Sequence, residues 1–260
     1  MSDVQAVTPG LIYDLGMNNG DDTGFYLKRG FDVVAVEANP ALCHEAEQRF
    51  AEAIAAGKLT IIKAAIGDHD GEVTFHVNLD NHHWSSTDIN WAGRDDSACE
   101  AITVASLSLA SIYARHGIPH FMKIDVEGAD LMVLEQVVKG SALPEFVSIE
   151  DCRFGFDYAR ILSGAGYENF QLVDQSAVGG SRDPVSGHVF PQARPASSDR
   201  IFPPSGNPIR NLWKPMRPPF APVKAFALLP APAGGTFTPH GMPNTRKRPR
   251  EPGSRIRQLC

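Results

Sequence analysis

Apolar runs of strand length alternate with helical patterns through the first 180 residues of the chain. Runs rich in β-branched and apolar residues predict strands at 11–15, 32–36, 59–62, 121–126, 146–149 and 170–173. Apolar spacing of helical period predicts helices at 22–30, 40–56, 107–115, 129–139 and 158–166. A further run, 73–77, predicts a hairpin-type strand, followed by an irregular stretch from 78 to 100. This order predicts an α/β fold with a doubly wound, mostly parallel sheet and helices on both faces.

Residues typical of helix termini mark where the first two helices begin. Either Asp22 or Thr23 is suited to cap the first helix. Asn39 followed by Pro40 is the usual order of an N-cap and a first helical residue. We therefore expect the second helix to begin at Pro40 and to continue without a break to about residue 56.

Proline and charge divide the chain near residue 180. Sixteen of the 20 prolines follow that position. Residues 1–180 carry 11 Lys and Arg against 27 Asp and Glu, whereas residues 181–260 carry 13 against 3. We expect an acidic α/β domain over 1–180 and a basic, Pro-rich, disordered or irregular tail over 181–260. Because proline disrupts both helices and sheet ladders, the tail is expected to supply no helix and no central strand.

Several protein classes are excluded before any site is considered. No apolar run reaches the roughly 18 residues of a membrane helix, and the N-terminal residues lack the pattern of a secretory signal. We therefore expect no membrane partner and a cytoplasmic location. The four cysteines, at positions 43, 99, 152 and 260, stand far apart without a C-x-x-C pair. Their spacing predicts free thiols, three of them buried, and argues against a zinc site or a disulfide framework.

The residues after the first predicted strand form a glycine turn that leads into a helix. Asp14, Gly16, Asn18 and Gly20 lie in this turn. Backbone N–H groups at such a helix N-terminus bind carboxylates and phosphates. Glu37 ends the next strand, 23 residues after Asp14, the spacing at which an acidic side chain binds two ribose hydroxyls. Because parallel sheets bind ligands beyond the carboxyl ends of their strands, these residues predict a cofactor that carries a nucleoside.

The middle position of the glycine turn distinguishes between cofactors. A dinucleotide fingerprint has glycine there, so that backbone can approach a pyrophosphate, and this chain has Asn18. The loop N–H groups suit a carboxylate and Asp14 suits an ammonium, and S-adenosylmethionine carries both. Asp68, after the third strand, is placed to accept from an adenine amino group. The turn at 68–71 explains the same residue without a ligand.

Ionisable residues interrupt the fourth predicted parallel strand, where a continuous apolar run is expected. Lys123, Asp125 and Glu127 recur at every second position, and burying such groups is costly unless they are paired or used. Glu150 and Asp151 end the next strand, so we expect an acidic cluster above the sheet centre. These residues fit four roles: a general base, a clamp for a substrate hydroxyl, a divalent metal site, or a structural ion pair of Lys123.

Two adjacent histidines, His82 and His83, lie in the irregular stretch that precedes Ser85. A lid or substrate loop that presents an imidazole as an alternative base fits this position. A surface histidine pair without a function fits it as well.

Taken together, the motifs at the strand ends resemble the FkbM family of S-adenosylmethionine-dependent methyltransferases over residues 10–178. The segments are DLGMNNG at 14–20, VEANP at 36–40, AIGD at 65–68 and MKIDVEGAD at 122–130. The resemblance implies a Rossmann-like class I methyltransferase fold. It also implies methyl transfer to a hydroxyl oxygen of a small molecule, sugar or glycan. The site residues that it implies are Asp14, Gly16, Asn18 and Gly20 in the cofactor loop, Glu37 at the ribose and Asp68 near the adenine.

Methyl transfer from a sulfonium leaves the protein to position the acceptor and to remove its proton. We expect Asp125 or Glu150 to orient or deprotonate the acceptor hydroxyl, with or without a divalent metal. Lys123 belongs to the same motif, and His83 is an alternative base. The family pattern ends near Gln175.

Other function classes stay open at this point. An NAD-dependent oxidoreductase would use the same fold and Glu37, although Asn18 argues against it. A non-catalytic domain whose tail contacts nucleic acid is suggested by the basic residues at 246–250. A solvated tail is the simpler explanation, and no base-flipping motif of the N-P-P-Y type follows the fourth strand. We therefore do not expect nucleic acid as a partner. The acceptor and the oligomeric state are not determined by these patterns.

Overall fold

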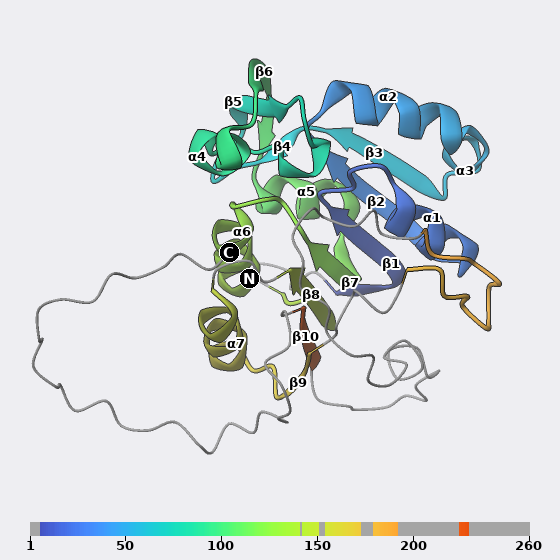
Figure 1. Ribbon diagram of the computed structural model, residues 1–260. Helices are drawn as coiled ribbons and strands as arrows, with labels where there is room; N and C mark the ends of the chain where they lie inside the picture. Colours follow the sequence, from blue (N-terminus) through green and yellow to red (C-terminus); the bar gives the residue numbers. More distant parts are fainter. Residues whose placement is uncertain (1–5, 141, 151–153, 173–178, 192–223, 229–260) are drawn as a thin grey trace, which may run out of the picture.

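A seven-stranded parallel sheet forms the centre of the protein in the computed structural model, which describes residues 6–140, 142–150, 154–172, 179–191 and 224–228 (Figure 1). Its strand order is β3-β2-β1-β7-β8-β10-β9. The bounds are β1 (Val7–Leu15), β2 (Asp32–Glu37), β3 (Leu59–Lys63), β7 (Ile118–Ile124), β8 (Phe146–Glu150), β9 (Asn169–Leu172) and β10 (Lys224–Leu228). The predicted doubly wound α/β fold is confirmed.

Helices cover both faces of this sheet because successive strand residues point to opposite sides. Ile12 and Phe121 pack with α1 (Asp21–Lys28), α2 (Pro40–Arg49) and α3 (Ala51–Ala55). Tyr13 and Met122 pack with α5 (Leu109–His116), α6 (Asp130–Lys139) and α7 (Gly155–Gly164). The sheet is thus buried on both sides. Within the described part of the chain, no helix has the length and apolar character needed to cross a membrane.

A second, three-stranded sheet lies at one end of the molecule, at the top of Figure 1. Its order is β4-β6-β5, with bounds β4 (Ala65–Ile66), β5 (Gly71–Asn78) and β6 (Cys99–Leu107). The structure confirms the strand predicted at 73–77 as part of β5, whereas the start of β6 lies in the stretch predicted to be irregular. The strand β6 has a β-branched centre, Ile102 to Val104, and it pairs antiparallel with β5 over eight residues. The segment between them, residues 79–98, carries η1 (His82–Trp84), α4 (Ile89–Ala92) and η2 (Arg94–Asp96).

The helix starts agree with the sequence prediction at one of two places. Asn39 caps α2 by accepting a hydrogen bond from the Ala41 N–H at 3.0 Å, as expected. Helix α1 begins instead after Gly20, whose φ of 76° is left-handed, and no side chain caps it. Neither Asp22 nor Thr23 acts as the cap, because both lie inside the helix. The expected long helix is also divided at Phe50, where φ is −112° and ψ is 22°.

The segment after residue 180 contributes to the structure more than its composition predicts. The strand β10 lies between β8 and β9, where we expected no central strand. It falls in a proline-free run between Pro222 and Pro230, so its backbone N–H groups are available for pairing. Residues 179–191 pack against α1, as described below. Among the cysteines, Cys43 is buried and Cys99 half-buried, both as free thiols, while Cys152 and Cys260 lie outside the described residues.

Candidate active site

The order of the central sheet reverses between β1 and β7, because β2 lies on one side of β1 and β7 on the other. The loop at residues 16–20 follows β1, and the loop at residues 125–129 follows β7. The two loops meet where the Asp125 N–H donates to the Leu15 carbonyl at 3.0 Å. Parallel sheets bind ligands at such a reversal. The predicted site residues therefore converge on the expected end of the sheet.

The loop after β1 has a backbone that needs its glycines. Gly16, Asn18 and Gly20 have left-handed φ values of 80°, 53° and 76°, a region that L-residues rarely adopt. A Cβ on Gly16 would lie within 1.8 Å of the Asp125 carbonyl oxygen. The Gly16 N–H donates to the Val36 carbonyl at 3.0 Å. This glycine allows three neighbouring strands to converge beneath the loop.

Glu37 lies at the end of β2, directly beside the same loop. One carboxylate oxygen accepts the Asn18 N–H at 2.8 Å and the other accepts the Asn39 N–H at 2.7 Å. Burial raises the pKa of Glu37 above its usual value, although these N–H groups oppose the shift. The side chain is thus positioned by the loop and the start of α2 together.

A buried lysine connects the two loops. The ammonium of Lys123 lies 3.1 Å from Asp22, 3.1 Å from Asp125 and 3.5 Å from Asp14. Thr23 donates a hydrogen bond to Asp14 at 2.6 Å. Burial raises the pKa of Asp14 to about 6, although the charge of Lys123 opposes this shift. Burial lowers the pKa of Lys123, but the surrounding carboxylates outweigh it and raise that pKa well above its usual value. The ammonium group beside Asp14 is therefore that of Lys123, whereas the sequence suggested the ammonium of a cofactor.

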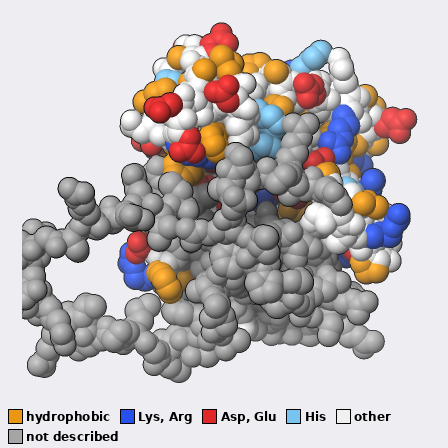
Figure 2. Space-filling view, viewed as in Figure 1, with side chains coloured by type: hydrophobic (Ala, Val, Ile, Leu, Met, Phe, Trp, Pro, Cys, Tyr) orange, Lys and Arg blue, Asp and Glu red, His pale blue; other side chains and the backbone are white. Residues whose placement is uncertain are grey.

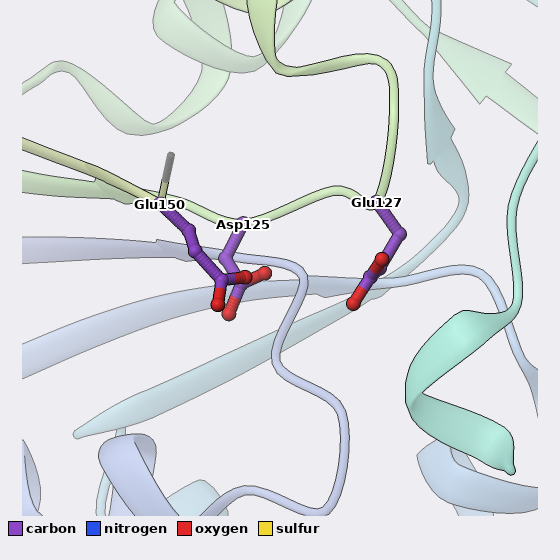
Figure 3. Close-up of side chains that lie close together, drawn as sticks. All are labelled: Asp125, Glu127 and Glu150. Carbon is purple, nitrogen blue, oxygen red and sulfur yellow. The ribbon is translucent and has the colours of Figure 1, made fainter. Parts of the chain in front are cut away.

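Three carboxylates cluster at the ends of β7 and β8. Figure 3 shows Asp125, Glu127 and Glu150 pointing to the same side of the ribbon, and one oxygen of each lies within 4.8 Å of the others. Asp125 and Glu150 are hydrogen-bonded to each other. The charge of Asp125 and burial raise the pKa of Glu150 to about 9. Burial opposes ionisation of Asp125, but Lys123 and Glu150 lower its pKa overall. Glu150 therefore holds the proton that the pair shares.

The segment 79–98 packs on the third carboxylate. Glu127, with a left-handed φ of 49°, accepts from Trp91 Nε1 at 2.6 Å and from Arg94 at 3.2 Å. The Arg94 guanidinium lies 4.4 Å from the ring centroids of both Trp84 and Trp91. Ser86 donates to the Glu127 carbonyl at 2.5 Å. Burial and the charge of Asp125 raise the pKa of Glu127 to about 7. These contacts make the segment one wall of the site.

His83 also belongs to this wall, whereas Asp68 lies apart from the cluster. Burial and the neighbouring His82 lower the pKa of His83, and the charges of Asp125 and Lys123 also act on its ring. Asp68 is exposed, and its partner is the His69 ring.

Figure 2 shows acidic side chains in red scattered over β5, β6 and α4. Asp151 and the basic residues at 246–250 lie outside the described residues.

Sequence reasoning missed four residues of this site. The sequence pattern indicates Asp22 and Thr23 only as helix caps, and it gives no role to Trp91 or Arg94. The available signal was two tryptophans, Trp84 and Trp91, followed by Arg94 in a stretch without a predicted regular element. Spacing alone could not reveal that Arg94 contacts both rings, because the contact depends on the turns of η1, α4 and η2.

Comparisons with known proteins agree with these motifs. The family model described as the methyltransferase FkbM domain matches residues 14–169. A search of curated proteins finds no match. Among solved structures, the methyltransferase FkbM from Methylobacillus flagellatus is similar at 16% identity, with a TM-score of 0.33. That alignment covers 49% of this chain and 28% of the other, so this chain spans less than a third of that protein's length.

Proposed function

Because the chain belongs to the FkbM methyltransferase family, we propose that it transfers a methyl group from S-adenosylmethionine to a hydroxyl oxygen of a small molecule, sugar or glycan. One arrangement supports the proposal. The left-handed glycine loop, the buried Glu37 and the paired Asp125 and Glu150 surround the point where the strand order reverses. This is where parallel sheets bind their ligands.

The residues around the loop have the chemistry that S-adenosylmethionine requires. The Glu37 oxygens accept the N–H groups of Asn18 and Asn39, and the Ala38 N–H also acts on the carboxylate. Because a carboxylate offers about four lone-pair positions, acceptor capacity is left for a ribose hydroxyl. The loop from Gly16 to Gly20 leads into α1 and would hold the carboxylate of the cofactor. We assign Asp68 to the adenine. Asp14 is wholly buried, so its role is to support the loop.

When bound, the cofactor supplies an electrophilic methyl group together with its own leaving group. The chain's task is then to orient the acceptor and to remove its proton. Asp125 is the proposed base because Lys123 favours its ionised form. Glu150 holds Asp125 in place by donating a hydrogen bond to it. His83 is the alternative base, since the lowering of its pKa keeps the imidazole neutral.

A divalent cation is the other use for the carboxylate cluster. Three carboxylates within 4.8 Å of one another form a hard oxygen site. However, the Arg94 guanidinium lies 3.2 Å from Glu127, and a positive charge there opposes a second one. We therefore favour the interpretation in which Asp125 and Glu150 share a proton without a metal.

The cytoplasmic location and the hydroxyl acceptor stay predictions.

Replacing Glu37 by glutamine is expected to weaken S-adenosylmethionine binding about 10- to 100-fold. The variant loses a charge-assisted hydrogen bond to ribose, worth about 1.5–3 kcal/mol. Calorimetric titration with S-adenosylmethionine, S-adenosylhomocysteine and NAD measures the change. The matched control is Glu47→Gln, because Glu47 is on α2 and its partner is the exposed Lys63.

Wild-type affinity in the Glu37→Gln protein, with thermal unfolding unchanged, would contradict the ribose assignment. Binding of NAD alone by the wild type would contradict the choice of cofactor. Binding of none of the three ligands would contradict the proposed function itself.

Replacing Asp125 by asparagine is expected to lower methyl transfer about 10²- to 10⁴-fold, the usual contribution of a general base. Cofactor affinity should stay within about twofold, because the contact of Asp125 with β1 uses its backbone N–H. The measurement is S-adenosylhomocysteine formed with a panel of methyl glycosides and small alcohols. Asp32→Asn is the control, since Asp32 is exposed and bound to Lys58.

The same assay separates the two uses of the cluster. Turnover that survives a chelator supports Asp125 as a base, whereas loss of turnover that Mg²⁺ restores supports a metal. A collapse of cofactor binding in Asp125→Asn would place Asp125 in the cofactor pocket or in the fold.

A further inference from the structure

Residues 179–191, which we call the strap, form a small closed turn outside the segment that the family model matches. Gly180 N–H donates to the Phe190 carbonyl and Asp183 N–H to the His188 carbonyl, at 2.9 and 2.7 Å. The Asp183 carboxylate closes the turn by accepting from the Ser186 N–H at 2.7 Å and from its hydroxyl at 2.6 Å. In Figure 1 the strap is the orange segment beside α1.

The strap is docked on α1 by an ion pair and by rings. Nη1 of Arg29 lies 3.3 Å from both carboxylate oxygens of Asp183, and the two side chains are 10% and 2% exposed. The Phe25 ring lies 5.5 Å from the His188 ring and 4.9 Å from the Phe190 ring, centroid to centroid. Both contacts are made by the second half of α1 and the residue that caps it.

The first half of α1 belongs to the candidate cofactor site. Asp21 pairs with Arg49 at 3.0 Å, and the same guanidinium nitrogen donates to the Asn19 carbonyl in the glycine loop at 2.9 Å. Asp22 and Thr23 bind Lys123 and Asp14. Because α1 is only eight residues long, whatever fixes its second half also fixes the loop at its start.

His188 is an unusual residue for such a docking surface. Its side chain is buried, and among the described residues neither ring nitrogen has a hydrogen-bond partner. The charged groups that act on it are Lys28 and Asp21 from α1, Arg49 from α2 and Asp183 from the strap itself. A proton on this ring would be a buried positive charge without a hydrogen-bond acceptor, close to two other positive charges.

We infer that the strap is an acid-sensitive brace of the cofactor site: docked, it holds α1 and the glycine loop in place, and protonation of His188 releases it. This inference rests on the proposed function, because S-adenosylmethionine is the ligand that reports it.

The direction of the pH effect follows from His188. A free histidine titrates near pH 6.5, and burial lowers the pKa of His188 below that value in the docked strap. The released strap therefore binds more protons, so docking weakens as the pH falls below about 6.5. Asp183 does not act in this range. Hydrogen bonds from Ser186 and the charge of Arg29 outweigh the effect of burial and lower the pKa of Asp183 below its usual 3.8.

The test compares the full chain with His188→Phe at pH 7.5 and 5.5. For each protein, the Kd for S-adenosylmethionine at pH 5.5 is divided by the Kd at pH 7.5. This ratio should be larger by about threefold or more in the wild type than in the variant. Acidification of the wild type should also speed amide exchange at Asp183, Gly187 and Phe190, after correction for intrinsic rates. His188→Phe keeps a ring in contact with Phe25 and Phe190 and should resist both changes. Other titrating groups of the site act in both proteins and cancel in the comparison.

A second pair of variants tests the ion pair without relying on pH. Arg29→Met should release the strap at pH 7.5 and raise the Kd about tenfold, whereas Arg29→Lys should restore both values, because a single nitrogen serves both oxygens of Asp183. Arg160→Met is the control, since Arg160 forms an exposed pair with Asp157.

The outcomes separate this inference from the proposed function. If the wild type binds S-adenosylmethionine and neither Arg29→Met nor acid changes its affinity relative to the controls, the brace is wrong and the function stands. If strap exchange rises as expected but the wild type binds no S-adenosylmethionine, the proposed function fails. Equal pH profiles of the wild type and His188→Phe would overturn the role of His188.

Discussion

Replacing Gly16 by alanine is expected to destabilise the protein by about 2–5 kcal/mol and to abolish cofactor binding. A left-handed φ costs an L-residue about 1–2 kcal/mol, and overpacking of backbone against backbone adds about 1–3 kcal/mol. The new Cβ would lie 1.8 Å from the Asp125 carbonyl oxygen and 2.8 Å from its carbon. Neither atom can move without separating β1 from β7. Urea unfolding and calorimetric titration measure the two losses.

Gly30→Ala is the matched control for this prediction. Gly30 has a left-handed φ of 88°, but nothing lies within 4 Å of the position that its Cβ would take. It should therefore lose only the conformational part, about 1–2 kcal/mol, and keep its affinity for the cofactor. Equal destabilisation by the two substitutions would show that the close approach of the two loops contributes nothing.

Replacing Lys123 by methionine is expected to cost about 3–5 kcal/mol of unfolding free energy, the usual effect of removing one partner from a buried ion pair. The substitution keeps an unbranched side chain that is one atom shorter but leaves the Asp14 and Asp125 carboxylates without their counter-ion. Lys139→Met is the control, because Lys139 is exposed and pairs with Glu135 one turn away. Its change should stay within about 0.5 kcal/mol.

The deficit of Lys123→Met should shrink as the pH falls from 7 to 5. Burial already raises the pKa of Asp14 to about 6 in the wild type, and loss of Lys123 removes an influence that lowers it. The folded pKa then lies further above the unfolded value of 3.8, so the folded protein takes up the proton first and gains stability in acid. Adding Asp14→Asn should recover part of the loss at pH 7. A deficit independent of pH would contradict this account.

The position of the acidic residues was predictable because sheet geometry is simple. Residues at every second position of a strand share a face, and Lys123 lies opposite Asp14 and Ser148 in the ladder. Lys123 in β7 and Glu150 at the end of β8 therefore lie on the α1 side, and Asp125 follows β7 directly. Pattern alone was sufficient to expect the cluster of Asp125, Glu127 and Glu150, although it did not indicate which of them holds a proton.

Long-range pairing explains what the sequence patterns left out. The strand β6 begins inside a stretch predicted to be irregular, and its extent is set by its pairing with β5. The contact of Arg94 with Trp84, Trp91 and Glu127 requires three short helical turns to pack together first. No local sequence signal encodes such contacts, because the segments that make them are distant in the sequence and each is stabilised by the other.

The sequence by itself determined the parallel α/β order, the glycine turn, the acidic end of β2 and the carboxylates at the sheet centre, because these follow from short-range periodicity and spacing. Only the tertiary structure decided that Asp14 and Asp22 share one lysine with Asp125, that Glu150 is the carboxyl with the raised pKa, and that residues 179–191 dock on α1. Charge and proline content suggested that the last 80 residues stand apart from the domain. The strap is an exception: it docks on α1, because the buried pair of Arg29 and Asp183 and the cluster of rings stabilise the contact. Composition does not encode such a contact.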